Sequence, residues 1–232
     1  MKKILLILCC LLPIFLLCQS NQPEITYSTN SFESKSNYLN INYGFIDLYK
    51  KDLNKLSSEV KNSNNFASSF PLNNVTYDIK SLGPIFFKYE YGLSDDIGIG
   101  LTYRYYLANF TETYIYSETT NYNSRIEYKD IGNYKITKNA LAARLNYHFI
   151  NEKKIDLFLG FSLGYSVLQY EYSYSSTKPQ HVPIQRFEFS EFPLYIGLNL
   201  GMRYYIDKNF GINFEVGYEN QSIIQTGLVI KI

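Results

Sequence analysis

Residues 192–204 read FPLYIGLNLGMRY, and every second residue in this stretch is large and apolar. The residues between them, from Tyr195 to Arg203, are tyrosine, glycine, asparagine, glycine and arginine. Successive side chains of a β-strand point to opposite faces. This period of two therefore predicts a strand with one apolar face and one small or polar face.

Seven further segments alternate in the same way, with large apolar or aromatic residues on one phase and small or polar residues on the other. They span residues 39–45, 85–91, 97–105, 141–149, 155–165, 212–218 and 224–232. Together with residues 192–204 they make eight predicted strands.

The links between these strands alternate between short and long. Short links at residues 93–96, 150–154 and 206–209 carry the Asp or Asn residues that tight turns favour. Long links cover residues 48–83, 107–138 and 167–191, and a brief one covers 219–223. This asymmetry is expected of an outer-membrane barrel, with short periplasmic turns and long external loops. Alternating tyrosines such as Tyr114, Tyr116, Tyr170, Tyr172 and Tyr174 indicate strands that continue into the long links as hairpins. For residues 53–70 of the first long link, a short amphipathic helix and disorder are both open.

The first 20 residues have the layout of a secretory signal peptide. Lys2 and Lys3 precede an apolar run of 14 residues, which is shorter than a membrane-spanning helix of ~20 residues. We therefore divide the chain into a cleaved signal peptide (1–20), an N-terminal extension (21–36) and a barrel domain (37–232). The three cysteines, Cys9, Cys10 and Cys18, all lie in the first segment, so disulfides cannot hold the mature fold. Lipidation of Cys18 is the alternative to simple cleavage.

Charge and composition narrow the class of protein. Without the signal peptide the chain has 20 basic residues against 21 acidic ones, which predicts no nucleic-acid partner. The chain is rich in aromatics, with 24 tyrosines and 16 phenylalanines, and it has no tryptophan. Beyond the signal peptide the sequence has no apolar run of helical-span length, and a closed β-barrel is the other way to cross a membrane.

The glycine- and aromatic-rich strands, the loop asymmetry and the strand-like terminus at residues 227–232 resemble the small outer-membrane β-barrel families, such as porin-like barrel domains and the transmembrane domain of outer membrane protein A. The resemblance covers about residues 37–232. It implies an all-β, eight-stranded, antiparallel, up-and-down transmembrane β-barrel. It also implies a monomer in the outer membrane of a Gram-negative-type cell, in contact with outer-membrane lipid and inserted by the barrel-insertion machinery. The chain ends on Ile232, where the family usually has an aromatic residue.

If the apolar phase faces lipid, the opposite phase lines the lumen. Nine ionisable residues would then project inward: Lys88, Glu90, Arg104, Arg144, His148, Asp156, Arg203, Glu215 and Lys231. An eight-stranded barrel is just wide enough to be filled by side chains, so we expect a structural charge network of paired opposite charges. Counting residues from the short turns puts Arg104, Arg144 and Glu215 near mid-height of the barrel. It puts Glu90, His148, Asp156 and Lys231 near the periplasmic end, where the short turns lie. Outward tyrosines are expected to form interfacial girdles: Tyr43, Tyr91, Tyr103, Tyr105, Tyr147, Tyr165, Tyr204 and Tyr218.

These observations predict a structural or surface-interaction role through the long external loops, with an unidentified surface partner. Two alternatives stay open: a narrow ion channel, and a secreted soluble barrel that binds a small apolar ligand and therefore has its apolar phase inside. We expect no enzyme and no cofactor. A lipid-acting enzyme would need His181, with Glu188 and Ser190 nearby, and no nucleophile-elbow pattern surrounds that serine. No metal site is expected, because no two histidines have ligand spacing.

Overall fold

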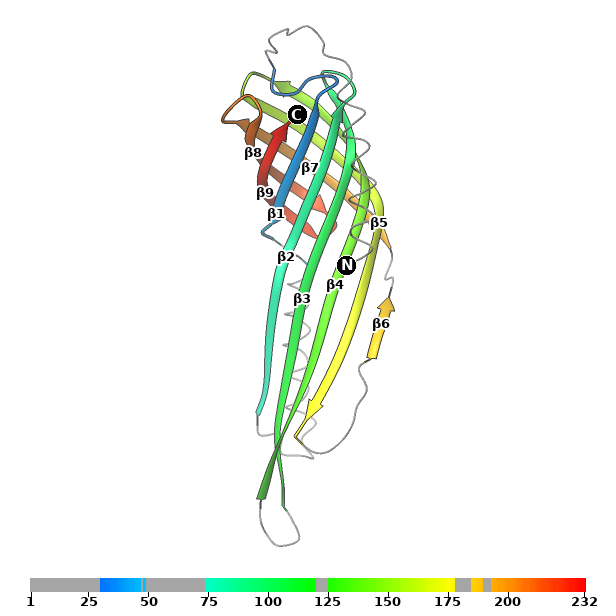
Figure 1. Ribbon diagram of the computed structural model, residues 1–232, viewed down its shortest axis with the longest axis vertical. Coiled ribbons are helices and arrows are strands. Elements are labelled where there is room, and N and C mark those ends of the chain that lie inside the picture. The colour runs from blue at the N-terminus through cyan, green and yellow to red at the C-terminus, as the bar shows by residue number, and fades with distance from the viewer. Residues whose placement is uncertain (1–29, 47, 49–73, 120–124, 178–184, 190–192) are drawn as a thin grey trace.

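The computed structural model describes residues 30–46, 48, 74–119, 125–177, 185–189 and 193–232 (Figure 1). The expected signal peptide, most of the first long link, His181 and Ser190 lie outside the described residues. No helix in the described part of the chain is long and apolar enough to cross a bilayer.

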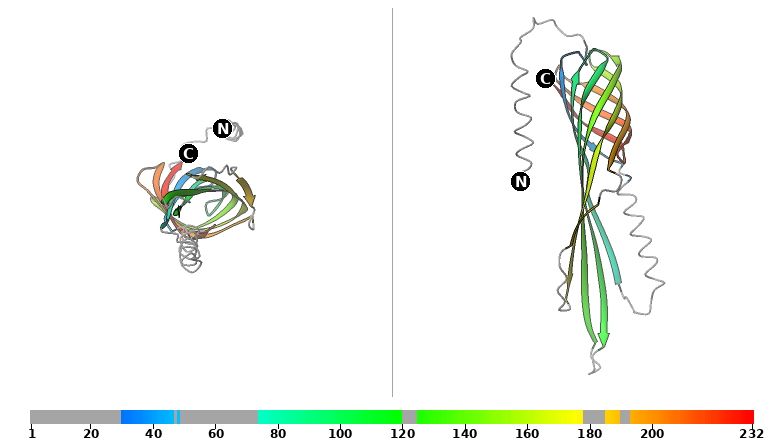
Figure 2. Two further views of the ribbon diagram at one scale, coloured as in Figure 1. Left: turned by 90° about the horizontal axis from the view of Figure 1, so that it is seen from below. Right: turned by 90° about the vertical axis from the view of Figure 1, so that its right-hand side faces the viewer.

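Nine described strands form one antiparallel sheet. They are β1 (Asn37–Gly44), β2 (Asn74–Gly92), β3 (Ile97–Thr119), β4 (Arg125–Asn151), β5 (Ile155–Ser176), β6 (Gln185–Phe189), β7 (Leu194–Tyr205), β8 (Phe210–Glu219) and β9 (Ser222–Lys231). Eight of them close into a ring in chain order, β6 being left out, because β4 pairs with β5, β5 with β7 and β9 with β1. Seen end-on, the strands form a closed ring (Figure 2). The structure therefore confirms the predicted eight-stranded up-and-down barrel.

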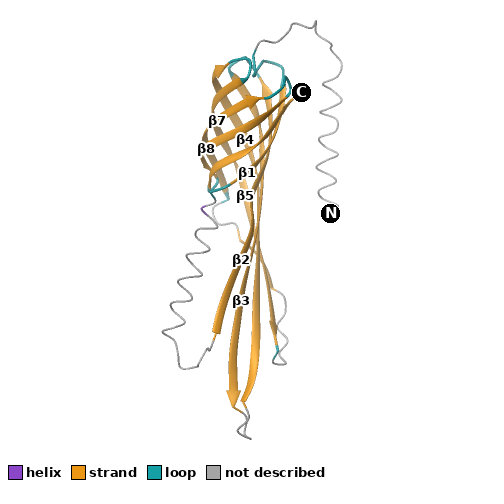
Figure 3. Ribbon diagram, turned by 90° about the vertical axis from the view of Figure 1, so that its left-hand side faces the viewer, coloured by secondary structure: helices purple, strands orange, loops and turns teal. Residues whose placement is uncertain are grey.

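Four strands continue well past the ring. Their outer parts are residues 74–82 of β2, 107–119 of β3, 125–139 of β4 and 167–176 of β5, and β6 pairs with β5 there. We call this part of the sheet the strand extension (Figure 3). The structure therefore confirms the hairpins expected from the alternating tyrosines. The backbone ladder continues past residues 85, 105, 141 and 165, where the apolar phase of the predicted strands stops.

Register determines which side chains face outward. Along β7 the burial alternates strictly: the leucines are exposed, and Tyr195, Asn199, Arg203 and Tyr205 are buried. Leu141, Leu198 and Leu200 expose half or more of their surface, which is unusual for apolar side chains of a protein in water. An outward apolar belt around a polar interior is the architecture of a transmembrane β-barrel. The inverted, soluble barrel requires the opposite arrangement of faces.

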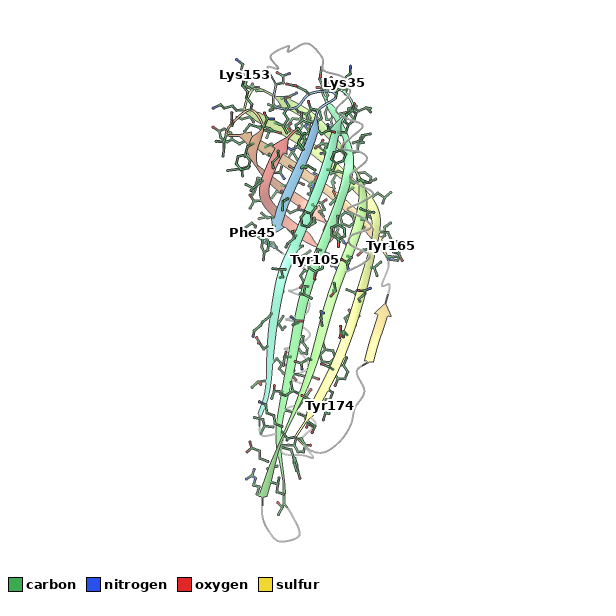
Figure 4. The ribbon with its side chains drawn as sticks, viewed as in Figure 1. Lys35, Phe45, Tyr105, Lys153, Tyr165 and Tyr174 are labelled. Carbon is green, nitrogen blue, oxygen red and sulfur yellow. The ribbon has the colours of Figure 1, made fainter. Side chains whose placement is uncertain are left out.

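The two ends of the barrel differ. Lys35 and Lys153 lie at the end with the short turns, which we call the turn end, and Phe45, Tyr105 and Tyr165 lie where the closed ring gives way to the strand extension (Figure 4). The tight β8–β9 turn has Asn220 and Gln221 with positive φ angles of 45° and 76°, as a two-residue hairpin of the primed type requires. All eight tyrosines of the expected girdles lie on the outward phase, six of them with exposed side chains.

Candidate functional site

The structure buries eight of the nine ionisable residues that were expected in the lumen. Their relative exposure is 5% or less, and Arg104 and Asp156 are fully buried. Lys231 differs, because it lies at the rim of the turn end and pairs there with Glu33 at 3.1 Å. The buried residues fall into two groups at different depths, and Arg104 lies apart, over the rings of Phe86 and Tyr106.

The first group, which we call the central cluster, consists of Lys88, Arg144, Glu215 and Glu219. The Lys88 ammonium lies 2.7 Å from one carboxylate oxygen of Glu215 and 2.7 Å from one of Glu219. Arg144 contacts the same two carboxylates at 2.8 and 3.2 Å. Two cations therefore share two anions, and the formal charge of the cluster is zero.

Amide side chains complete the hydrogen bonding of the central cluster. Asn42, Asn199 and Asn213 donate to Glu215, at 3.3, 2.5 and 2.8 Å. Gln225 donates to Glu219 at 2.7 Å and accepts from Lys88 at 2.8 Å. A buried carboxylate is tolerated when charged and neutral donors satisfy its oxygens, as they do here.

The second group, which we call the turn-end cluster, consists of Glu90, His148, Asp156 and Arg203. The His148 ring bridges two carboxylates, with Nδ1 2.6 Å from Asp156 and Nε2 2.9 Å from Glu90. Arg203 donates to the same two carboxylates, at 3.2 Å for Asp156. The guanidinium also lies over the Phe158 ring, with 4.6 Å to its centroid, which favours its charge in a dry environment.

Residues before β1 close the barrel at the turn end, next to the turn-end cluster. The Phe32 ring is fully buried and stacks on the His148 ring, with 3.5 Å between centroids and 9° between planes. Asn151 holds this segment in place, since it accepts from the Phe32 amide at 2.8 Å and donates to the Phe32 carbonyl at 2.6 Å. The N-terminal extension, as far as it is described, therefore acts as a plug.

Replacing Phe32 by alanine is expected to lower the free energy of unfolding by about 3 kcal/mol, because it removes a large buried ring from a well-packed site. Urea titration in detergent micelles, read by the difference in mobility between unheated and heated samples on a gel, measures this. Leu93→Ala is the matched control, because Leu93 lies in a turn and is 59% exposed. Equal effects of the two substitutions would contradict the plug.

Some residues of the lumen were missed by the sequence analysis. Glu219 was placed in the link 219–223, yet it continues the inward phase of Asn213, Glu215 and Gly217 and is fully buried. Continuing that alternation by one step would have found it. Phe32 carries no such signal, because it precedes the first strand and its position depends on the chain folding back over the barrel.

The strand extension has an aromatic face on the same phase as the lumen. We define the tyrosine face as Tyr77, Phe110, Tyr114, Tyr116, Tyr128, Tyr134, Tyr172 and Tyr174, which the strand register places on one side of the sheet. Ring centroids are 5.7 Å apart for Tyr77 and Phe110, 5.5 Å for Phe110 and Tyr134, and 4.6 Å for Tyr134 and Tyr172. The rings thus form a continuous row across four strands.

A carboxylate lies in the middle of this face. Glu112 accepts hydrogen bonds from the hydroxyls of Tyr114, at 2.9 Å, and Tyr134, at 3.0 Å. Burial raises the pKa of both tyrosine hydroxyls above the ordinary value, and the neighbouring Glu112 carboxylate adds to the shifts. Both hydroxyls therefore stay protonated and continue to donate to Glu112 over the physiological pH range.

Comparison with known proteins adds the following. No family model matches the sequence, and no curated protein sequence matches it. Among solved structures, the chain is similar to the N-terminal β-barrel domain of Pseudomonas aeruginosa OprF, at a TM-score of 0.39 and 12% identity, covering 86% of this chain and 99% of that one. It is also similar to Ail, the attachment invasion locus protein of Yersinia pestis, at a TM-score of 0.33 and 9% identity, covering 85% of this chain and 97% of that one.

The two histidines and the possible metal ligands were placed as follows. No group of three or more His, Cys, Asp or Glu side chains there could hold a metal ion. His148 is held between two carboxylates and under a phenylalanine ring inside the barrel. His181, the candidate base for a lipid-acting enzyme, lies outside the described residues.

Proposed function

We propose that this protein is an outer-membrane β-barrel in which the barrel serves as a sealed anchor and the strand extension serves as an interaction platform at the cell surface. The observation that carries the proposal is the division of β2–β5 into two parts. Their inner parts belong to a ring with an outward apolar belt, and their outer parts form a sheet in which Asn109, Asn133 and Lys135 are exposed. The ring portions of these strands are therefore compatible with a lipid environment, and the strand extension is compatible with water.

The orientation of the platform follows from the asymmetry of the two ends. Outer-membrane barrels have short periplasmic turns and long external loops. Here the turns at residues 93–96, 152–154 and 206–209 lie at one end together with Ile232, and the strand extension lies at the other. The expected signal peptide supports export to that membrane.

Cysteine labelling on intact cells tests this orientation. The chain has cysteines only at positions 9, 10 and 18. Labelling of an introduced cysteine is therefore compared with labelling of the protein without it. A membrane-impermeant maleimide should label Ser117→Cys, in the strand extension, on intact cells. It should label Lys153→Cys, in a turn at the other end, only after the cells are opened. Labelling of Lys153→Cys alone on intact cells would overturn the proposed orientation.

The packing of the lumen argues against the ion-channel alternative. The side chains of Tyr38, Phe86, Arg104, Phe158 and Arg203 fill the interior and are inaccessible to solvent. A conducting pore needs a water-filled path, which these packed side chains block. In planar bilayers the purified protein should therefore show no discrete conductance steps, and regular steps at the single-channel level would restore the channel as the leading function.

A further inference from the structure

Among the described residues of the strand extension, the tyrosine face carries carboxylates, and beyond the barrel mouth it has no basic side chain. Glu112 and Asp130 lie on this face, diagonally opposite each other, since Glu112 pairs with Gly132 and Asp130 with Tyr114. Their hydrogen-bond partners there are hydroxyls, of Tyr114 and Tyr134 for Glu112 and of Ser176 for Asp130. On the described part of this face the basic residue is Lys138, at the mouth, where it donates to Gln221 at 3.2 Å.

The opposite face of the same sheet has a different composition. Lys80, Lys129 and Lys135 lie there on the alternate phase, among Thr, Asn and Ser residues, and all three are exposed. Lys80 pairs with Asp78 at 3.2 Å, and Lys135 pairs loosely with Glu171 at 3.9 Å. The two faces therefore differ: the opposite face carries lysines together with carboxylates such as Asp78 and Glu171, whereas Glu112 and Asp130 on the tyrosine face lie among aromatic rings and hydroxyls.

Aromatic rings next to carboxylates favour a cationic ligand. A guanidinium or ammonium group is attracted to the face of a tyrosine ring, and the attraction adds to its pairing with a carboxylate. Gly132 leaves room for the carboxylate, because a Cβ at that position would lie 2.8 Å from a Glu112 carboxylate oxygen. Glu112 thus lies over Gly132 and is partly exposed, so a positive side chain that approaches across the sheet can pair with it.

One edge of the sheet next to this face has no strand paired with it in the described part of the chain. β1 pairs with β2 at residues 85–91 of β2, whereas residues 74–82 pair with β3 on their other side. Unpaired backbone groups at a sheet edge can add a further strand, and a strand added there lies ~4.8 Å from β2. Alternate side chains of the added strand would lie beside Tyr77 and reach toward Glu112, which is one strand further in.

We propose, resting on the surface role given above, that the tyrosine face and the adjoining edge of β2 bind an extended segment of a partner protein that carries arginine or lysine at every second position. The segment pairs its backbone with residues 74–82 of β2. Its cationic side chains lie beside the ring of Tyr77 and pair with Glu112, which is on the strand next to β2. The Glu112 carboxylate among the tyrosine rings favours this occupant over an acidic or neutral one.

The full-length protein in detergent micelles, titrated with fluorescently labelled decapeptides, tests the proposal by anisotropy. The probes are alternating Arg-Thr, Gln-Thr and Glu-Thr decapeptides. We expect the Arg-Thr probe to bind at least about tenfold more tightly than the Gln-Thr probe, since a hydrogen bond to a charged group contributes about 1.5–3 kcal/mol and tenfold in affinity is about 1.4 kcal/mol. The Glu-Thr probe should not bind. Equal affinities for the three probes would overturn the proposal.

Variants assign the binding to this face. Glu112→Gln should weaken binding of the Arg-Thr probe by about tenfold, the same charge-assisted contribution. Glu171→Gln, which removes a sheet carboxylate from the opposite face, is the matched control and should leave the affinity unchanged. Both variants are first shown to keep the heat-dependent gel shift of a folded barrel. An unchanged affinity of folded Glu112→Gln, or an equal loss in both variants, would show that the site lies elsewhere.

Two further measurements separate an extended polypeptide from a simple cation. Two Arg-Thr probes are compared, one N-methylated at the odd residues and the other at the even residues. Each lacks the backbone donors of one strand edge, so the probe methylated on the edge that pairs with β2 should lose binding. Spermine should not displace the probe at equal concentration of charge. Full displacement by spermine, with both methylated isomers still binding, would replace the proposed segment by a small polyamine. Surface labelling of Ser117→Cys does not depend on any of these results, so failure of this inference is distinct from failure of the proposed function.

Discussion

Replacing Glu215 by glutamine is expected to lower the free energy of unfolding of the barrel by about 3–5 kcal/mol, the cost of leaving a buried charge uncompensated. Glu215 is 1% exposed, and both Lys88 and Arg144 lie within 2.8 Å of it. The substitution keeps the shape of the side chain but leaves two cations with the single carboxylate of Glu219. The loss is measured as a shift in the urea midpoint of the protein in micelles or lipid vesicles.

Two comparisons separate buried pairing from charge in general. Glu171→Gln removes a partly exposed carboxylate whose partner Lys135 is 3.9 Å away, and it should change the stability by less than about 1 kcal/mol. The double variant Lys88→Met/Glu215→Gln leaves Arg144 paired with Glu219, so it should recover part of the stability that Glu215→Gln loses. A single Glu215→Gln variant as stable as the original protein would show that the central cluster contributes nothing to the fold.

Placing an arginine at Leu200 should destabilise the protein in lipid vesicles by about 2–4 kcal/mol, the cost of a lipid-facing arginine near the bilayer midplane. Leu200 lies on the outward phase of β7, near the middle of the strand, and is 50% exposed. In water an arginine at such an exposed site is harmless. Urea titration of the protein folded into vesicles gives the difference.

Ile126→Arg is the matched control for Leu200→Arg. Ile126 is also a large apolar residue with an exposed side chain, at 42%, but it lies on β4 near the far tip of the strand extension. We expect it to change the stability by less than about 0.5 kcal/mol, as surface substitutions in water do. If both substitutions are equally mild, the belt does not face lipid and the barrel is a soluble one.

The strands and the two phases of each strand could be predicted from the sequence because they are local properties. The phase of a residue such as Leu200 or Asn199 can be predicted because the residues two positions away are similar in character. The tight turns can be predicted because they carry Asp or Asn residues. Residues 53–70 and the surroundings of His181 are different, since their sequence does not favour one structure, and they lie outside the described residues.

The candidate site could be predicted only in part. Glu90, His148 and Asp156 are predicted at one depth, because the depth of a residue in the barrel follows from its distance in sequence from a short turn. The structure places His148 in hydrogen-bonding contact with both carboxylates. The partners at each depth could not be predicted, since they depend on the stagger between strands around the closed ring. Lys88 and Glu219, for example, are 131 residues apart in the chain and 2.7 Å apart in the barrel. The row of rings from Tyr77 to Tyr172 likewise exists only because four strands pair in one register.

The sequence alone predicts the eight strands of the ring, each with one apolar and one polar phase, and short turns at one end with long connections at the other, but not β6, which lies in the predicted link 167–191. Only the tertiary structure decided that the apolar phase faces outward, that Phe32 plugs the turn end and that Glu112 lies among tyrosine rings. The physical reason is that alternation is set by the geometry of a single extended chain, which is the same for a barrel and for its inverse. Pairing and closure depend instead on which distant residues meet across the sheet, and those contacts are formed only in the folded barrel.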